Sequence, residues 1–172
     1  MDVMILDFIQ QHLRCDFLDK GMSFVTKLGD GGIIWIFCSL LLLLFPKTRR
    51  AGAAVAVSLI LEALCFNVLL KPLVARIRPF DVNTAVQLLI PPPKDFSFPS
   101  GHTGASFAVV SALYFSRKRL WIPVLVLAVI IGFSRLYLYV HYPTDVLAGA
   151  LIGSILGWFG HRLVSRYRPP QT

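Results

Sequence analysis

Charged residues are scarce in this sequence. Only 15% of its 172 residues are Asp, Glu, Lys or Arg, whereas soluble domains carry about 25%. Acidic residues are the rarer kind, with 9 Asp and Glu against 17 Lys and Arg. Cysteine is also rare, and Cys15, Cys38 and Cys65 lack the spacing of metal ligands. These scarcities exclude an ordinary soluble domain, a disulfide-stabilised secreted module and a coiled coil.

Hydrophobic residues, by contrast, make up 56% of the chain and occur in long runs. Five of these runs have roughly the length that crosses a hydrocarbon core of about 30 Å as an α-helix. They are residues 28–45, 51–70, 103–116, 121–140 and 144–161. The sequence therefore predicts an all-α fold, a polytopic membrane bundle of five transmembrane helices over residues 28–161. Too few residues remain for a second domain, so we expect residues 1–172 to form a single integral membrane domain.

Residues 1–27 differ from these runs because they mix apolar and acidic side chains. Ile5, Phe8 and Ile9 are interspersed with Asp2 and Asp7. This pattern predicts an interfacial helix that lies along the membrane surface with its apolar face in the lipid. A sixth transmembrane span over the same residues is the alternative.

The basic residues indicate which end of the bundle faces the cytoplasm. Nine of the 17 lie in two loops between spans and in the C-terminal tail, with no acidic residue among them. They are Lys47, Arg49, Arg50, Arg117, Lys118, Arg119, Arg162, Arg166 and Arg168. The positive-inside rule makes this side cytoplasmic, including the tail 162–172. The N-terminus, the loop 71–102 and the turn 141–143 then lie on the extracytoplasmic side.

This topology brings three polar segments, 71–79, 98–103 and 134–145, to the extracytoplasmic face. In the first, Lys71 supplies a compact positive charge and Arg78 a planar guanidinium, and both suit phosphate oxygens. A continuous helix would place the two side chains on one face. In the second, Ser100 and Gly101 precede a predicted helix and offer backbone N–H groups to an anion. In the third, Arg135 adds another guanidinium. The three segments together predict a phosphate site.

Two histidines accompany these cations. His141 and Asp145 are four residues apart. Because Pro143 favours a helix that begins near Tyr142, we expect the carboxylate to reach back toward the imidazole. A carboxylate on one ring nitrogen leaves the other nitrogen free to act as a nucleophile. His102 is then available as a general acid for the leaving oxygen.

In this order and spacing, the segments resemble the signature of the type 2 phosphatidic acid phosphatase superfamily. The matching motifs are Lys-x6-Arg-Pro from Lys71, Pro-Ser-Gly-His from Pro99 and Ser-Arg-x5-His-x3-Asp from Ser134. The resemblance implies an all-helical fold and hydrolysis through a phosphohistidine intermediate, with no metal or other cofactor. By motif position it makes His141 the nucleophile, Asp145 its orienting partner and His102 the general acid. The residues that it assigns to the phosphoryl oxygens are Lys71, Arg78, Ser100, Gly101 and Arg135.

We therefore expect a lipid phosphatase in the cell membrane, with its active site extracytoplasmic and a membrane lipid as its substrate. Undecaprenyl diphosphate is the first expected substrate, and phosphatidate or phosphatidylglycerol phosphate is the alternative, since the motifs recognise the phosphate and not the tail. Two more distant alternatives are a vanadate-dependent haloperoxidase and a non-enzymatic lipid transporter that depends on Glu62. Nucleic acid is not an expected partner, because the net charge of +8 is divided among short clusters.

Three further features lie outside these motifs. Glu62 and Asn67 fall inside the second apolar run, where polar groups are costly in lipid, and are expected to face the bundle interior. Gly149, Gly153 and Gly157 recur every four residues, which favours close packing against another helix or against a second copy of the chain. The Pro-Pro-Pro-Lys segment 91–94 is expected to form a stiff loop beside the site.

Overall fold

The computed structural model describes residues 1–166, and every regular element within them is a helix. Two of the helical segments are irregular, a 3₁₀ turn named η1 and a π-helical segment named η2. The elements are α1 (Asp2–His12), α2 (Asp16–Leu28), η1 (Asp30–Gly32), α3 (Ile33–Leu44), α4 (Arg49–Ala63), η2 (Leu64–Leu70), α5 (Lys71–Val74), α6 (Pro79–Val82), α7 (Gly101–Phe115), α8 (Trp121–Tyr137) and α9 (Pro143–Arg166). The all-α fold predicted from the sequence is confirmed.

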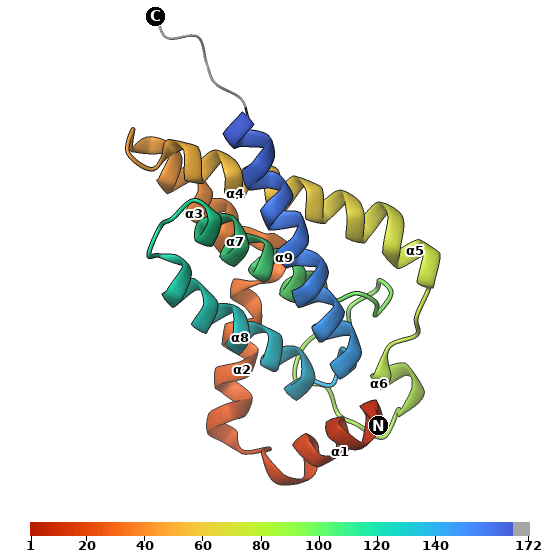
Figure 1. Ribbon diagram of the computed structural model, residues 1–172. Helices are drawn as coiled ribbons and strands as arrows, with labels where there is room; N and C mark the ends of the chain where they lie inside the picture. Colours follow the sequence, from red (N-terminus) through yellow and green to blue (C-terminus); the bar gives the residue numbers. More distant parts are fainter. Residues whose placement is uncertain (167–172) are drawn as a thin grey trace, which may run out of the picture.

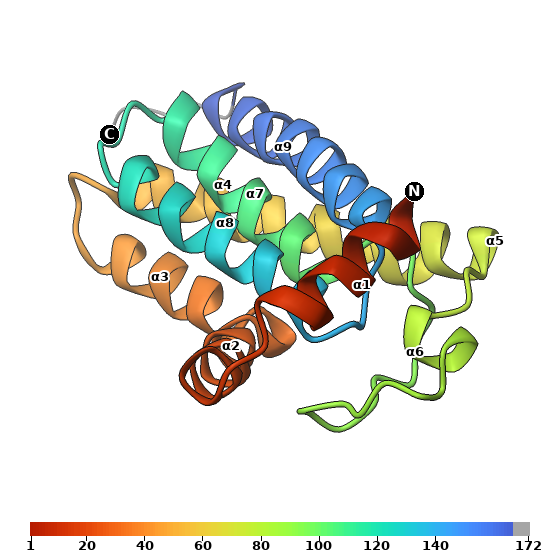
Figure 2. The same cartoon turned by 90° about the horizontal axis from the view of Figure 1, so that it is seen from below.

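Helix α7 lies at the centre of the bundle, and α4, α8 and α9 pack around it (Figure 1, Figure 2). Many of its side chains are small, among them Ala105, Ala108 and Ala112, so neighbouring helices approach it closely. Trp35 of α3 completes this core and donates its indole N–H to Ser106 Oγ at 3.0 Å. The centre of the molecule therefore fixes the position of α7, whose first turn carries the Gly101–His102 pair.

The glycine stripe of α9 (Gly149, Gly153, Gly157) faces α7. A Cβ atom on Gly153 would lie 2.3 Å from the backbone O of Gly104, and a Cβ atom on Gly157 would lie 2.3 Å from the backbone O of Ala108. Both distances are far below van der Waals contact, so only glycine permits the observed separation of the two helices. The expected close packing is thus confirmed, and it occurs within the chain instead of against a second copy.

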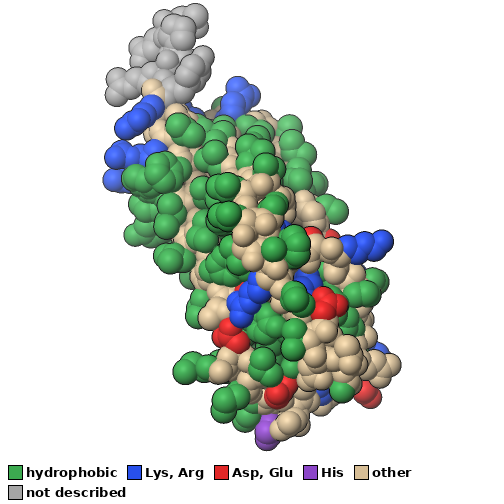
Figure 3. Space-filling model, turned by 90° about the vertical axis from the view of Figure 1, so that its right-hand side faces the viewer, with side chains coloured by type: hydrophobic (Ala, Val, Ile, Leu, Met, Phe, Trp, Pro, Cys, Tyr) green, Lys and Arg blue, Asp and Glu red, His purple; other side chains and the backbone are tan. Residues whose placement is uncertain are grey.

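The opposite face of α9 is apolar and points outward. Its exposed side chains recur every four residues: Leu147, Leu151, Ile155, Phe159 and Leu163. Large apolar side chains are exposed on α3, α4 and α8 as well. Figure 3 shows one face of the molecule, where hydrophobic side chains cover the region between a basic end and a lower part that carries charges of both signs. An apolar belt of this kind matches the hydrocarbon core of a bilayer.

Within the described residues, fewer helices than predicted are long and apolar enough to span a membrane. The helical runs Arg49–Val82 and Pro143–Arg166 are long and apolar enough to cross a membrane. A third span results if α2 and the η1–α3 segment, which are bent by 45°, are counted as one, and α8 is apolar but shorter. The five-span count therefore stays a prediction. The predicted tail 162–172 begins within α9, and its remainder, with Arg168, lies outside the described residues.

Residues 1–27 form two helices, α1 and α2, where the sequence predicts a single interfacial helix. The break between them is held by Tyr137 of α8, whose hydroxyl donates to Asp19 Oδ1 at 2.5 Å and accepts from the backbone N–H of Cys15 at 3.4 Å. These contacts come from a distant part of the chain, so the local pattern of residues 1–27 does not contain them.

The three polar segments lie together at one end of the bundle (Figure 1). The loops 45–48 and 116–120 occupy the other end, where Lys118 Nζ donates to the backbone O of Lys47 at 2.8 Å. The long segment 75–100 and the turn between α8 and α9 are thus separated from the basic loops by the length of the helices, as the predicted topology requires.

Candidate active site

Most of the residues singled out in the sequence line a single cavity of about 290 Å³. The residues concerned are Lys71, Arg78, Gly101, His102, Arg135 and His141. Ser100 and Asp145 do not line it, and both are fully buried. The two histidines therefore face the same cavity, together with the three predicted cations and Lys27.

We call this cavity the head cavity. The three predicted cations reach it from separate elements. Lys71 begins α5, Arg78 lies between α5 and α6, and Arg135 is close to the C-terminal end of α8. The prediction that one helix face carries both Lys71 and Arg78 is wrong. Ala75 adopts a left-handed backbone at φ 47°, and Pro79 keeps the residue before it extended at ψ 153°. Arg78 consequently enters the cavity from an extended segment.

Asp95, from the loop before α7, pairs with two of these cations. Its carboxylate accepts hydrogen bonds from Lys71 Nζ and, at 2.7 Å, from Arg78 Nη2. Partial burial alone would raise the pKa of Asp95, but its hydrogen bond to Lys71 and the charges of Lys71 and Arg78 lower that pKa to about 2. The carboxylate is therefore ionised at neutral pH.

His141 lies in the turn between α8 and α9, and its ring is buried. Its Nδ1 atom is 2.7 Å from the backbone O of Ser97, which can only accept a hydrogen bond, so Nδ1 carries the proton. Its Nε2 atom is 3.3 Å from Arg78 Nη1, which can only donate. Both neighbours require the same tautomer, with the lone pair on Nε2.

The charge state of His141 also suits a nucleophile. Burial of the ring, followed by the nearby charges of Arg135 and Arg78, holds the pKa of His141 well below its usual value of 6.5. The ring is therefore neutral at pH 7, and the Nε2 lone pair is available toward the cavity.

Asp145 does not take the hydrogen bond from His141 that the sequence predicts. Its Oδ2 atom is 3.6 Å from Nδ1, beyond hydrogen-bonding distance. It accepts instead from Ser97 Oγ at 2.5 Å and from the backbone N–H of Tyr142 at 2.9 Å. Because α9 begins at Pro143, as predicted, the carboxylate also satisfies a free N–H at the helix start. Asp145 thus holds Ser97, and the Ser97 carbonyl orients the imidazole.

The second histidine has its own carboxylate partner. His102 Nε2 is 2.9 Å from Asp30 Oδ1 and 3.5 Å from Arg135 Nη1. The preceding Ser100 directs its hydroxyl to Thr103 Oγ1 at 3.0 Å, within the first turn of α7. Gly101, also in this first turn, lies beside Lys71, because a Cβ atom on Gly101 would be 3.7 Å from Lys71 Nζ.

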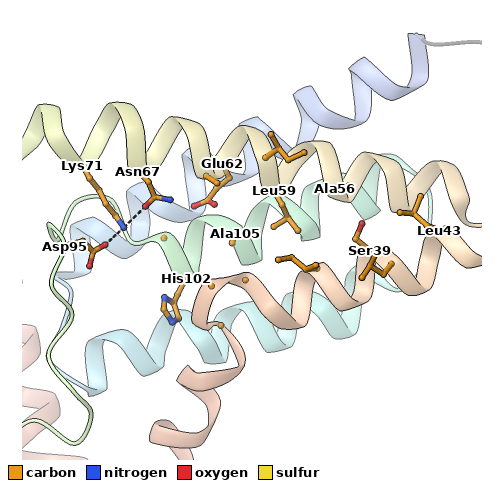
Figure 4. Close-up of a pocket in the computed structure, with 18 residues that line it drawn as sticks. Ser39, Leu43, Ala56, Leu59, Glu62, Asn67, Lys71, Asp95, His102 and Ala105 are labelled. Carbon is orange, nitrogen blue, oxygen red and sulfur yellow. Dashed lines mark hydrogen bonds and ion pairs between the residues drawn. The ribbon is translucent and has the colours of Figure 1, made fainter.

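A second cavity, of about 580 Å³, runs between α3 and α4 (Figure 4). Along most of its length it is lined by apolar side chains, which include Ile36, Leu40, Leu43, Leu59 and Ile60. At one end it reaches Lys71, Asp95, Gly101 and His102, which also line the head cavity. The apolar groove and the cationic head cavity therefore adjoin each other at these four residues.

Two polar residues of the second apolar run line this groove. Glu62 is buried, as expected, and its Oε1 atom has no hydrogen-bond partner in the part of the chain that the structure describes. Asn67 is exposed and accepts from Lys71 Nζ at 3.0 Å, so the expectation that it faces the bundle interior is wrong.

Four residues of the site carry no signal in the sequence motifs. Asp95, Ser97 and Asp30 contact Lys71, His141 and His102 as described above. Arg76 donates to Asp145 Oδ1 at 2.6 Å and to Asp2 Oδ2 at 3.0 Å, and thereby ties α1 to the start of α9. The sequence alone does not identify these four residues, because their partners are set by the fold.

Comparisons with known proteins agree on one family. The model of the PAP2 superfamily matches residues 51–169. An undecaprenyl-diphosphatase of Sulfolobus acidocaldarius is 37% identical over 145 residues, which are 84% of this chain and 69% of the relative. The undecaprenyl-diphosphatase BcrC of Bacillus subtilis is 31% identical over 156 residues, covering 88% of this chain and 78% of the relative.

Two solved structures share the whole architecture. LpxE of Aquifex aeolicus superposes with a TM-score of 0.81 at 28% identity, over 94% of each chain. The transmembrane PAP2-type phosphatidylglycerolphosphate phosphatase of Bacillus subtilis superposes with a TM-score of 0.78 at 27% identity, over 99% of this chain and 87% of that one.

Proposed function

Since this chain belongs to the PAP2 superfamily and is a membrane lipid phosphatase, we propose that it hydrolyses undecaprenyl diphosphate to undecaprenyl phosphate. The observation that carries the proposal is an apolar groove that adjoins a cationic cavity lined by a buried, neutral histidine. In this proposal the apolar groove takes part of the prenyl tail, and the cations take the diphosphate. Phosphatidylglycerol phosphate is the alternative substrate, favoured by the likeness to the Bacillus subtilis structure.

In the proposed mechanism His141 Nε2 attacks the terminal phosphorus. A bond forms between Nε2 and phosphorus while the bond to the bridging oxygen breaks, and undecaprenyl phosphate leaves with a proton from His102. Lys71, Arg78 and Arg135 stabilise the charge on the phosphoryl oxygens, and the Gly101 backbone N–H contributes a further donor. The Ser97 carbonyl keeps the attacking tautomer in place.

The second step returns the enzyme to its starting state. A water molecule gives a proton to His102 and attacks the phosphohistidine, so the nitrogen–phosphorus bond breaks and inorganic phosphate is released. The cations supply the positive charge that metal ions supply in other phosphatases. The expected domain, a membrane bundle over residues 28–161 preceded by the N-terminal helices, forms the scaffold for both steps.

The proposed substrate is tested by phosphate release from purified protein in detergent with EDTA present. We expect rapid release from undecaprenyl diphosphate, slower release from phosphatidylglycerol phosphate and phosphatidate, and no loss of activity on addition of the chelator. Faster release from the glycerolipids would favour the alternative substrate. A requirement for Mg²⁺ would contradict the mechanism.

The groove is tested by narrowing it. Ala56→Trp places an indole among the groove residues, so we expect the KM for undecaprenyl diphosphate to rise about tenfold, which corresponds to the loss of roughly two buried methylene groups. Isopentenyl diphosphate, which has the same head and a short tail, should be hydrolysed as before. Leu151→Trp, on the exposed face of α9, is the matched control. Equal effects of the two tryptophans on KM would show that the tail binds elsewhere.

We propose further that the active site is extracytoplasmic, as the positive-inside rule indicates. Lys94 is exposed in the loop beside the head cavity, and Lys47 is exposed at the opposite end of the bundle. In a background in which the exposed Cys15 is replaced by Ser, a membrane-impermeant maleimide should label Lys94→Cys in intact cells and Lys47→Cys only after lysis. The reverse pattern would place the site in the cytoplasm.

A further inference from the structure

The two cations nearest His141 and Gly101 already hold an anion that belongs to the chain. The Asp95 carboxylate accepts from Lys71 Nζ through one oxygen and from Arg78 Nη2, at 2.7 Å, through the other. A carboxylate and a phosphoryl group use the same donors in the same geometry. Asp95 therefore occupies the donors that the proposed mechanism assigns to substrate.

The loop that carries Asp95 does not depend on this carboxylate for its position. Arg78 Nε donates to the backbone O of Asp95 at 2.7 Å, and the backbone N–H of Ser97 donates to the backbone O of Arg76 at 2.9 Å. Ser97 is held in addition by its contacts with Asp145 and His141. These bonds persist when the Asp95 side chain rotates away.

The carboxylate is also the most exposed member of the cluster. The Asp95 side chain is 50% exposed, whereas those of Lys71 and Arg78 are 10% and 3% exposed. A half-exposed carboxylate returns to water at little cost, while the two buried cations keep their places. Lys71 retains Asn67 Oδ1 at 3.0 Å when Asp95 leaves.

The place of Asp95 in the fold is where a lipid head must pass. Asp95 is one of the four residues that line both the groove and the head cavity (Figure 4). A phosphoryl group that moves from the groove toward His141 consequently passes this carboxylate. Its negative charge repels the arriving phosphate until the carboxylate rotates out.

We propose that Asp95 is a specificity-determining residue whose carboxylate competes with phosphate for Lys71 and Arg78. The inference rests on the proposed function. A terminal phosphoryl group, which carries close to two negative charges at pH 7, displaces the carboxylate, whereas the singly charged phosphodiester of an ordinary membrane lipid does not. After hydrolysis the carboxylate returns to the cations and helps to expel inorganic phosphate.

The inference is tested by titrating purified protein in detergent with inorganic phosphate in a calorimeter. Asp95→Asn keeps the shape of the side chain and removes the competing charge. We expect phosphate to bind about tenfold more tightly, because a carboxylate that occupies the cations in roughly nine-tenths of the molecules weakens the apparent affinity by that factor. Asp81→Asn is the matched control, because Asp81 forms no ion pair within residues 1–166. Unchanged or weaker binding to Asp95→Asn would overturn the inference. This measurement needs no turnover, so it is independent of the proposed substrate.

A kinetic measurement separates competition from a positioning role. With undecaprenyl diphosphate, Asp95→Asn should lower both KM and the inhibition constant of inorganic phosphate, and Asp95→Ala should do the same because both remove the charge. A fall in kcat without a fall in these two constants would mean that Asp95 only positions Lys71 and Arg78, and the inference would be wrong.

Discussion

Replacement of His141 by Ala should reduce phosphate release from undecaprenyl diphosphate by at least about a thousandfold, because His141 is the histidine whose tautomer the Ser97 carbonyl fixes with the lone pair on Nε2. Lys71, Arg78 and Arg135 would still bind the phosphoryl group, so the loss should fall on kcat more than on KM. Steady-state kinetics in detergent measure both constants.

Two further variants decide what a loss of activity means. His141→Asn retains an amide N–H for the Ser97 carbonyl, so it should keep the fold and remain inactive. His12→Ala removes an exposed histidine on α1 that lines neither cavity, and its activity should match that of the unchanged protein. Turnover of His141→Asn at a rate near that of the unchanged protein would remove His141 from the mechanism.

Replacement of Gly153 by Ala should have the largest effect on stability. The new Cβ atom would meet the backbone O of Gly104 at 2.3 Å, and neither backbone can move aside without separating α7 from α9. Overpacking of this kind costs about 3 kcal/mol, which corresponds to a fall in Tm of roughly 6–12 °C for a chain of this size. Thermal unfolding in detergent measures the shift.

The same substitution at Gly21 provides the control. A Cβ atom on Gly21 of α2 has no neighbour within 4 Å, and alanine is the better helix former, so Gly21→Ala should keep or slightly raise the Tm. Gly153→Ala should also lower activity, because α7 carries His102 and the start of α9 holds the Ser97–Asp145 pair. Equal Tm values for the two variants would contradict the packing between α7 and α9.

The parts of the structure that depend on local pattern were predictable from the sequence. The apolar runs predicted helices, Pro143 predicted the start of α9, and the repeat of Gly149, Gly153 and Gly157 predicted close packing but not that α7 is the partner. The motif residues that line the head cavity were also predictable, since the segment order and the charge distribution place Lys71, His102 and His141 at one end of the bundle, but Asp30 and Asp95 of the same cavity were not.

Features that depend on tertiary contacts were not predictable in this way. Ser97 orients His141 through its backbone carbonyl. Every residue type offers this group, so the sequence does not mark the position. The path between Lys71 and Arg78 turns at Ala75, whose left-handed backbone is unusual for a residue other than glycine. The break between α1 and α2 needs Tyr137, which belongs to another helix.

The proposed mechanism depends on one chemical event, the transfer of a phosphoryl group to His141. Undecaprenyl diphosphate labelled in its terminal phosphate should be mixed with the protein, quenched in alkali within the first turnover and digested for mass spectrometry. We predict a label that is stable in alkali, labile in acid and located on His141, and none on His141→Asn. Label on a different residue, or turnover without any labelled protein, would contradict the account.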